Sequence, residues 1–442
     1  MEARGTGVRG LARAVPCNPG HVSNLRSGRG RPSPEMAARL DEILAAGGVL
    51  AAAAAAEAAS ARGPRPAQPG GVPQVPREFV VPRARQRFRI YGSVTGSLAP
   101  DPDFYDRLTR VVEKKARIDS PVMAWMERCL AEHRRVEDSI GAEPLIGIMG
   151  SQLSVVAGMA REAAGPLLDS VVDLAAQYAQ FMAWLCNDLG DKGAALAWYD
   201  RAQDWAIEAG DANMAATTLS MKAHLAWSAG DAVRCVRLGE AARWNDKRTS
   251  MGVQGMATQM IARGYALDSD ADKAHRAIDE AENLISSAAS HPEDEPPWMY
   301  FYGDTWFTAQ RGMIETELAE RKVGNPRRAV DLLGKALRDL PESYRRDRAW
   351  YGTMLARAHA AADDYDAAAG TALKFAGDAV AVNVYATRDL EDLSSVLGRH
   401  KVSGARDLAD ALSEIKLRTL HKFSCTGMPS RTFCKRSDRN LS

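Results

Sequence analysis

The 442-residue sequence predicts an all-α protein in which two helical regions are joined by an Ala/Pro-rich segment. Three observations lead to this prediction. Residues 10–33 contain two short helical stretches around a tight turn, followed by an arginine-rich loop. Residues 49–82 have the low complexity of a linker. From about residue 167, small side chains recur with the spacing of paired antiparallel helices.

The N-terminal stretch has the composition of a helix pair that packs on one side and is polar on the other. The predicted helices span residues 10–15 and 19–27. Asn18 is a favourable N-cap, and Pro19 at the first helical position loses no hydrogen bond. The second helix can bury one face and present another to a DNA groove, with Val22 and Leu25 inside and Gly20, His21, Ser23 and Asn24 outside.

Ten residues of this stretch occupy positions of a known pattern: Leu11, Ala12, Asn18, Val22, Ser23, Leu25, Gly28, Arg31, Pro32 and Ser33. The stretch resembles the helix-turn-helix of phage-repressor-like (XRE-type) regulators. The resemblance implies a recognition helix at 19–27 and double-stranded DNA as a partner. The DNA contacts it implies are Asn18, Gly20, His21, Ser23, Asn24, Arg26, Arg29 and Arg31, of which the last two would contact phosphates.

The sequence departs from that family in two places. Pro16 stands where the family usually has a glycine, and only seven residues precede Val8, whereas such domains begin with a longer helix. We therefore expect a domain that lacks most of its first helix in this sequence, with residues 2–4 as the last turn. Either the true start lies upstream or the domain is incomplete. A small helical bundle with exposed arginines is the alternative.

Charge is unevenly distributed along the chain. The formal net charge is +1, but residues 1–90 hold 14 arginines, no lysines and 6 acidic residues, a net of +8 that leaves −7 for the remainder. A basic N-terminal region suits contact with nucleic acid. The acidic remainder would be repelled by DNA, so we expect it to have a different partner.

The sequence lacks the patterns of membrane proteins, secreted proteins and familiar enzymes. The six cysteines are scattered, which indicates a reducing cytoplasm rather than a disulfide framework or zinc site. There is no signal-peptide core, and the alanine run at 51–56 is too short to cross a membrane. The eight histidines have no metal-ligand spacing, and no phosphate loop or nucleophile elbow occurs. We expect a soluble cytoplasmic protein that is not an enzyme and has no cofactor or metal.

A further amphipathic helix is predicted after the arginine loop, with Met36, Leu40 and Leu44 on one face and Gly47-Gly48 as its stop. The predicted organisation is a helix-turn-helix domain at 1–46, a linker at 47–82, a helical adaptor at 83–165, a repeat superhelix at 166–415 and a frayed tail at 416–442.

Small residues recur at three depths of successive helix pairs, spaced by 12 and then 7 residues, as in Ala183, Ala195 and Ala202. This spacing is similar to that of tetratricopeptide repeats, in which two antiparallel helices touch at small side chains. The unit with Glu317 at a small-residue position is the weakest, and an alanine-rich bundle without repeats is the alternative. The other matching positions are Ala223, Cys235, Ala242, Ala262, Ala274, Ala281, Ala356 and Ala368, with Phe375 as a large exception; Gly190-Asp191 and Gly230-Asp231 fill one turn 40 residues apart.

The resemblance to tetratricopeptide repeats implies a concave groove lined by the first helix of each pair. Amides and hydroxyls there can pair with a peptide backbone and an arginine with a carboxylate, which suits a short extended peptide. A proline-rich insertion at 286–304 is expected to be a loop whose aromatic residues either fill the superhelix or cover the groove. The implied groove residues are Gln177, Gln180, Trp184, Asn187, Thr217, Ser220, His224, Trp227, Gln259, Arg263, Trp350, Thr353 and Arg357.

A helix-turn-helix, a linker and a repeat superhelix together resemble two-part transcriptional regulators, many of them from actinomycetes. That resemblance implies a sequence-specific DNA-binding homodimer whose repeat domain senses a peptide or protein partner and thereby changes DNA binding. Two other classes stay open. One is a repeat scaffold for protein partners with a vestigial DNA element, and the other is an enzyme with an unfamiliar site in residues 83–165.

Overall fold

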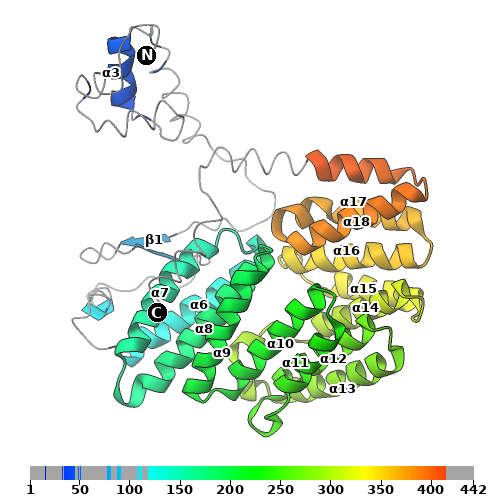
Figure 1. The fold of residues 1–442 in the computed structure, drawn as a ribbon, viewed down its shortest axis with the longest axis horizontal. Coiled ribbons are helices and arrows are strands. Elements are labelled where there is room, and N and C mark those ends of the chain that lie inside the picture. Colours follow the sequence, from blue (N-terminus) through cyan, green and yellow to red (C-terminus); the bar gives the residue numbers. More distant parts are fainter. Residues whose placement is uncertain are drawn as a thin grey trace. The chain divides into compact units, whose positions relative to one another are not determined.

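A computed structural model describes residues 118–414 without a gap, together with Pro34–Leu44, the strands Arg77–Val80 and Arg87–Ile90, and a few single positions. The chain divides into two units, Met1–Gly71 and Val72–Ser442. The described part is almost entirely α-helical, which confirms the predicted class at that level (Figure 1). Among the described helices, none combines the length and the apolar composition needed to cross a membrane.

The N-terminal unit contains α3 (Pro34–Leu44), the helix expected after the arginine loop. Leu40 is buried and Met36 and Leu44 are half-buried, so the predicted apolar face is the inner one. Past the end of the helix, Gly48 adopts a left-handed φ of 88° and donates its N–H to Asp41 Oδ1 (2.9 Å). A left-handed glycine in this place is the expected stop.

Two short strands differ from the prediction for the end of the linker and the start of the adaptor. β1 (Arg77–Val80) and β2 (Arg87–Ile90) pair antiparallel, with Phe79 opposite Phe88. We expected a linker up to residue 82 and helix after it. The sequence of β2 alternates arginine with an apolar residue, and this period of two favours a strand over a helix.

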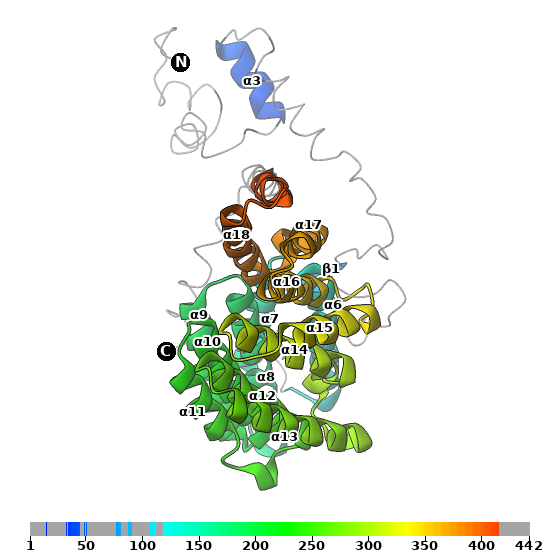
Figure 2. The ribbon, with the colours of Figure 1, turned by 90° about the vertical axis from the view of Figure 1, so that its right-hand side faces the viewer.

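Residues 168–382 form five antiparallel helix pairs that stack side by side (Figures 1 and 2). The first helices of successive pairs also contact one another and form a continuous inner layer. After the fifth pair, α18 (Val384–Arg399) packs on α17 and α16, and residues 404–414 are helical. The pairs are α8 (Leu168–Asp188) with α9 (Lys192–Ala209), α10 (Ala212–Ser228) with α11 (Ala232–Ala242), α12 (Met251–Leu267) with α13 (Ala271–Ser290), α14 (Asp304–Glu320) with α15 (Pro326–Asp339), and α16 (Arg345–Ala361) with α17 (Tyr365–Val382).

One local structure recurs in the turns inside these pairs. An aspartate precedes the second helix and its carboxylate accepts the N–H three residues on, as Asp191 does from Ala194 (3.0 Å). The residue before the aspartate is left-handed, with φ of 80° at Gly190. Glycine tolerates that φ and aspartate caps the helix, which explains the recurring Gly-Asp of the sequence. The same turn occurs at Gly230-Asp231, Ser269-Asp270 and Asp363-Asp364.

The predicted small-residue triplets lie where the helices of a pair touch, and every one of their positions is at most 6 % exposed. Phe375 fits at such a position because it packs against Gly352 of the facing helix, where a Cβ atom would lie 2.3 Å from the ring. Glu317 is also buried, and its carboxylate accepts the indole N–H of Trp227 (2.9 Å). Both exceptions are therefore matched by a specific partner.

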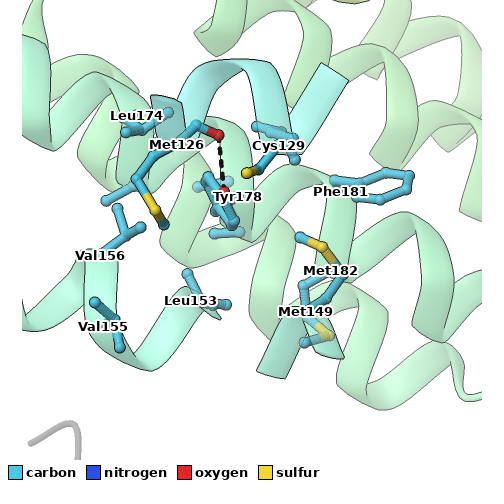
Figure 3. Close-up of a cluster of buried hydrophobic side chains, with 14 of the residues drawn as sticks. Met126, Cys129, Met149, Leu153, Val155, Val156, Leu174, Tyr178, Phe181 and Met182 are labelled. Carbon is cyan, nitrogen blue, oxygen red and sulfur yellow. Dashed lines mark hydrogen bonds between the residues drawn. The ribbon is translucent and has the colours of Figure 1, made fainter. Parts of the chain in front are cut away.

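α6 (Ser120–Ile140) and α7 (Ile146–Glu162) belong to the packed body of the array. α6 contacts α8, α16 and η5 (Pro297–Met299), which lie far apart in the sequence. Its apolar side packs with α7 and α8 around Tyr178, whose hydroxyl donates to Met126 O (2.9 Å; Figure 3). The region expected to be an adaptor thus bridges the two ends of the helix stack.

The insertion between the third and fourth pairs is not the simple loop that was expected. α13 continues to Ser290, so residues 286–290 are helical. The short 3-10 helices η4 (Pro292–Asp294) and η5 follow. Trp298 then donates its indole N–H to Thr217 Oγ1 (3.1 Å), and this bond brings the aromatic residues onto the inner layer.

Candidate ligand cavity

The inner layer of helices encloses a partly open cavity of about 130 Å³. Its walls are formed by α6, by the first helices of the five pairs and by residues 298–301 of the insertion, which we call the aromatic segment. The lining is mostly aromatic and thioether side chains with a few charged groups, as in many small-ligand sites. A cavity of this size accommodates a group about as large as one aromatic ring.

Many of the predicted groove residues line this single cavity, although they come from four different helices. Trp227 lies directly behind the wall, with its ring centroid 6.5 Å from that of Trp350. The predicted residues in the wall are Gln180, Trp184, Thr217, His224, Gln259, Arg263 and Trp350.

The remaining predicted groove residues do not line the cavity, because contacts within the protein engage their polar groups. Gln177 donates to Asp173, Asn187 accepts from Tyr385, Arg357 pairs with Glu320 and Asp389, and Ser220 and Thr353 donate to backbone carbonyls of their own helices.

Three tryptophans surround His224 in the wall. The ring centroids of Trp184, Trp227 and Trp350 lie 5.9, 5.4 and 6.0 Å from that of the imidazole. Burial, reinforced by the positive charge of Arg263, lowers the pKa of His224 well below its ordinary value, so the ring is neutral. His224 is 8 % exposed, and its Nε2 atom has no hydrogen-bond partner among the described residues.

Within the lining, Arg346 of α16 is paired with carboxylates of the protein. Its nitrogens lie 3.0, 3.1 and 3.0 Å from carboxylate oxygens of Glu137, Asp188 and Asp347, and all four side chains are at most 7 % exposed. The guanidinium carbon also lies 4.5 Å from the ring centroid of Trp184. We call these four charged residues the paired cluster. It ties together α6, α8 and α16.

Arg263 of α12 is stacked in the same way but has no such partner. Its guanidinium carbon lies 4.5 Å from the ring centroid of Trp227, and a terminal nitrogen donates to Gln310 Oε1. The side chain is 2 % exposed, and its Nε atom has no hydrogen-bond partner in the described part of the chain. Glu317 influences Arg263 electrostatically without forming an ion pair with it in that part. This guanidinium is therefore buried without a carboxylate contact.

Arg134 of α6 is a second arginine of this kind. Its guanidinium carbon lies 5.7 Å from the ring centroid of Trp298 and 6.0 Å from that of Phe181. Within the described residues its hydrogen bonding consists of a long contact to Gln177 O (3.5 Å). Burial lowers the pKa of Arg134 to about 10, which leaves it charged at neutral pH.

Asp138 of α6 holds the aromatic segment in place. Its carboxylate accepts the hydroxyl hydrogen of Tyr300 (2.9 Å). Burial, followed by the nearby charge of Asp347, raises the pKa of Asp138 to about 7. This carboxyl is therefore partly protonated at neutral pH, close to the paired cluster.

Sequence reasoning missed the contributions of α6. Arg134 and Glu137 lie on the same helical stripe as the buried Met126 and Leu130, since these positions are separated by four, four and three residues. Charged residues within an apolar stripe indicate buried polar contacts, and this pattern could have identified them. The other lining residues that were not predicted include Asp138, Trp306, Gln310, Arg346 and Asp347.

The predicted DNA contacts Asn18, Gly20, His21, Ser23, Asn24, Arg26, Arg29 and Arg31 lie outside the described residues. In comparisons with protein-family models, curated proteins and solved structures, no match to this chain is found.

Proposed function

We propose that this protein is a DNA-binding transcriptional regulator whose helical array binds a ligand in the cavity and thereby alters DNA binding. The observation that carries the proposal is the aromatic cavity in which Arg263 Nε and His224 Nε2 are buried and have no hydrogen-bond partner among the described residues. Stacked helix pairs with small residues at their contacts support assigning the array to tetratricopeptide repeats. The helix-turn-helix assignment rests on the sequence of residues 10–33.

The proposed ligand is smaller than an extended peptide lying along an open groove. α6 and the aromatic segment occupy part of the inner face that such a peptide would need. The remaining space suits a small molecule, or one side chain that a peptide or protein partner inserts. Binding rather than catalysis is supported by the lining, where Arg346 and Tyr300 engage the described carboxylates.

Regulation requires the ligand to favour one arrangement of the protein over another. The cavity is suited to this because its walls come from α6, from helices of every pair and from the aromatic segment. A ligand that contacts several of these elements would stabilise one packing of the array. We propose that the regulator is a homodimer, since helix-turn-helix proteins of this type read paired half-sites.

DNA selection from a random library tests the proposal. The full chain is used at two salt concentrations, because non-specific binding by a basic region is lost as salt rises. Enrichment of a palindromic site at the higher salt supports a dimeric regulator. Enrichment of no site at either salt favours the second candidate, a repeat scaffold for protein partners.

Substitutions in the recognition helix sharpen this test. His21→Ala or Asn24→Ala is expected to relax base preference and to cost about 1–3 kcal/mol if the residue makes a good base contact. Arg29→Ala or Arg31→Ala should weaken binding to all sequences and reduce the salt slope by about one. Arg65→Ala, in the predicted linker, is the control and should leave both quantities unchanged. Identical site preferences in all variants would defeat the assignment.

A further inference from the structure

We infer that the unpartnered nitrogens of Arg263 and His224 bind the carboxylate of a small acid whose body is apolar and about the size of one ring. The inference deepens the proposed function, on which it rests, by naming the chemical class of the ligand. It follows from three properties of the cavity: hydrogen-bonding groups without partners, the distribution of charge, and the character of the walls.

Buried polar groups in folded proteins almost always have hydrogen-bond partners, so the exceptions in one cavity need an explanation. One of them, Glu137 Oε1, lacks a hydrogen bond among the described residues but lies 3.0 Å from Arg346 Nε in an ion pair. Arg263 Nε and His224 Nε2 are both buried and unpartnered among the described residues. Both side chains line the cavity, and both contact Trp227, at 4.5 Å from the guanidinium carbon and 5.4 Å from the imidazole centroid. A carboxylate has two acceptor oxygens and can accept from an arginine and from an imidazole N–H at once.

The charges in the wall of the cavity favour an anion beside Arg263 and His224. Glu137 and Asp347 pair with Arg346, and Asp138 accepts from Tyr300, so the described acidic groups of the lining are already engaged. Arg263 has no carboxylate contact in the described part of the chain, and its charge acts on His224. A ligand carboxylate would supply the missing counter-charge where the dielectric is low.

The walls favour an apolar body on the ligand. The rings of Trp184 and Trp350 lie beside His224, with centroids 5.9 and 6.0 Å from that of the imidazole, and the aromatic segment adds further rings to the lining. Aromatic and thioether walls bind a flat apolar group through burial of its surface. The volume of about 130 Å³ limits that group to about one ring.

Titration of the full chain with matched pairs of probes tests the inference. The probes are benzoate, phenylacetate and cyclohexanecarboxylate, each compared with its primary amide, which has the same shape but no charge. Binding is followed by tryptophan fluorescence, since Trp184, Trp298, Trp306 and Trp350 line the cavity, and by calorimetry. We expect at least one carboxylate to bind and its amide to bind at least tenfold more weakly. Equal binding of acid and amide, or binding of neither, overturns the inference.

Two variants locate the carboxylate. Arg263→Met keeps the length of the side chain without its charge, and His224→Phe keeps a ring without its nitrogens. Each should weaken binding of the carboxylate about tenfold or more and weaken the already weak binding of the amide, which still accepts through its carbonyl oxygen, by a smaller factor. The matched control is Arg311→Met, which removes an arginine of α14 that pairs with Asp279 and Glu282 outside the cavity. Undiminished binding to both cavity variants would place the acid elsewhere and overturn the inference.

Further arms identify the source of the carboxylate and separate this inference from the proposed function. N-acetyl-Gly-Phe with a free or an amidated C-terminus tests whether the acid is the end of a peptide; preference for the free form supports the same site chemistry. If phenethylamine binds and the acids do not, the inference is overturned, because a cation would then be bound by the carboxylates of the paired cluster. All titrations are done without DNA. An acid that binds to a chain that selects no DNA site therefore removes the regulator proposal and leaves the ligand class standing.

Discussion

Arg346 and Arg263 line the same cavity and stack on a tryptophan at the same distance, with 4.5 Å between guanidinium carbon and ring centroid. They differ in what neutralises them. Arg346 lies within 3.1 Å of three carboxylates, whereas Arg263 has none in the described part of the chain. Since the two side chains are buried to a similar degree, the difference separates an arginine that is neutralised within the protein from one that lacks a carboxylate partner among the described residues.

The partners of the two arginines also come from different distances along the chain. Arg346 joins α16 to Asp188 of α8, 158 residues earlier, and to Glu137 of α6. Arg263 contacts side chains of the neighbouring first helices, Trp227 of α10 and Gln310 of α14. The paired cluster therefore holds the two ends of the stack together, while Arg263 lies among α10, α14 and α16, since its guanidinium carbon is also 5.4 Å from the ring centroid of Trp350.

The largest expected effect is the loss of the paired cluster. Arg346→Met leaves three carboxylates buried without their counter-charge, and we expect the free energy of unfolding to fall by about 3–5 kcal/mol. Urea unfolding monitored by circular dichroism measures this. The control is Arg345→Met on the same helix, which removes a half-exposed pair with Asp378 and should cost less than about 1 kcal/mol.

Unlike Arg346→Met, Arg263→Met should not lower the free energy of unfolding. It removes a buried charge that has no carboxylate contact with any described residue, and Gln310 Oε1 keeps its bond from Gln259. The loss of stacking on Trp227 offsets part of this gain. We expect the free energy of unfolding of the ligand-free chain to stay the same or to rise by up to about 2 kcal/mol. If the free energy of unfolding falls as far as it does in Arg346→Met, Arg263 is structural and the distinction between the two arginines is removed.

The same contrast explains how much could be predicted from the sequence. The helix pairs and their inner face depend on local spacing, so His224, Arg263 and Trp350 could be assigned to one groove from the 40-residue period. Asn187 and Arg357 fit that period equally well. However, Tyr385 and Asp389, both of α18 after the last repeat, engage them, and no repeat pattern predicts such contacts.

Contacts between distant segments account for the other differences. α6 lies across the stack and forms an ion pair with α16, between Glu137 and Arg346, which the sequence of α6 alone does not predict. Phe375 at a small-residue position is explained by Gly352, and a glycine opposite a large residue could have been sought in the facing helix. Local patterns thus predicted the array, while long-range charge pairing determined which residues line the cavity.

The smallest expected effect concerns Asp138, an acidic residue close to the paired cluster. Asp138 faces Tyr300 of the aromatic segment, Arg346 and Asp347 of α16 and Glu137 of its own helix, and burial raises its pKa to about 7. Because the pKa is higher in the folded state, the stability contributed by the protonated form is complete below the ordinary pKa near 4 and is lost as pH rises through 7.

Asp138→Asn can still accept the hydrogen bond from Tyr300 but does not titrate. We therefore expect the variant to exceed the wild type in stability by on the order of 1 kcal/mol at pH 8, with a smaller difference at pH 5. Urea unfolding at both pH values measures this, with Asp366→Asn, in the first turn of α17, as a control for a carboxylate outside the cavity. A variant that is more stable than the wild type by the same amount at both pH values would mean that Asp138 is ionised throughout. The paired cluster and Asp138 would then carry their full negative charge, and the preference for an anion would have to come from His224 and from the two arginines without a carboxylate contact among the described residues, Arg134 and Arg263.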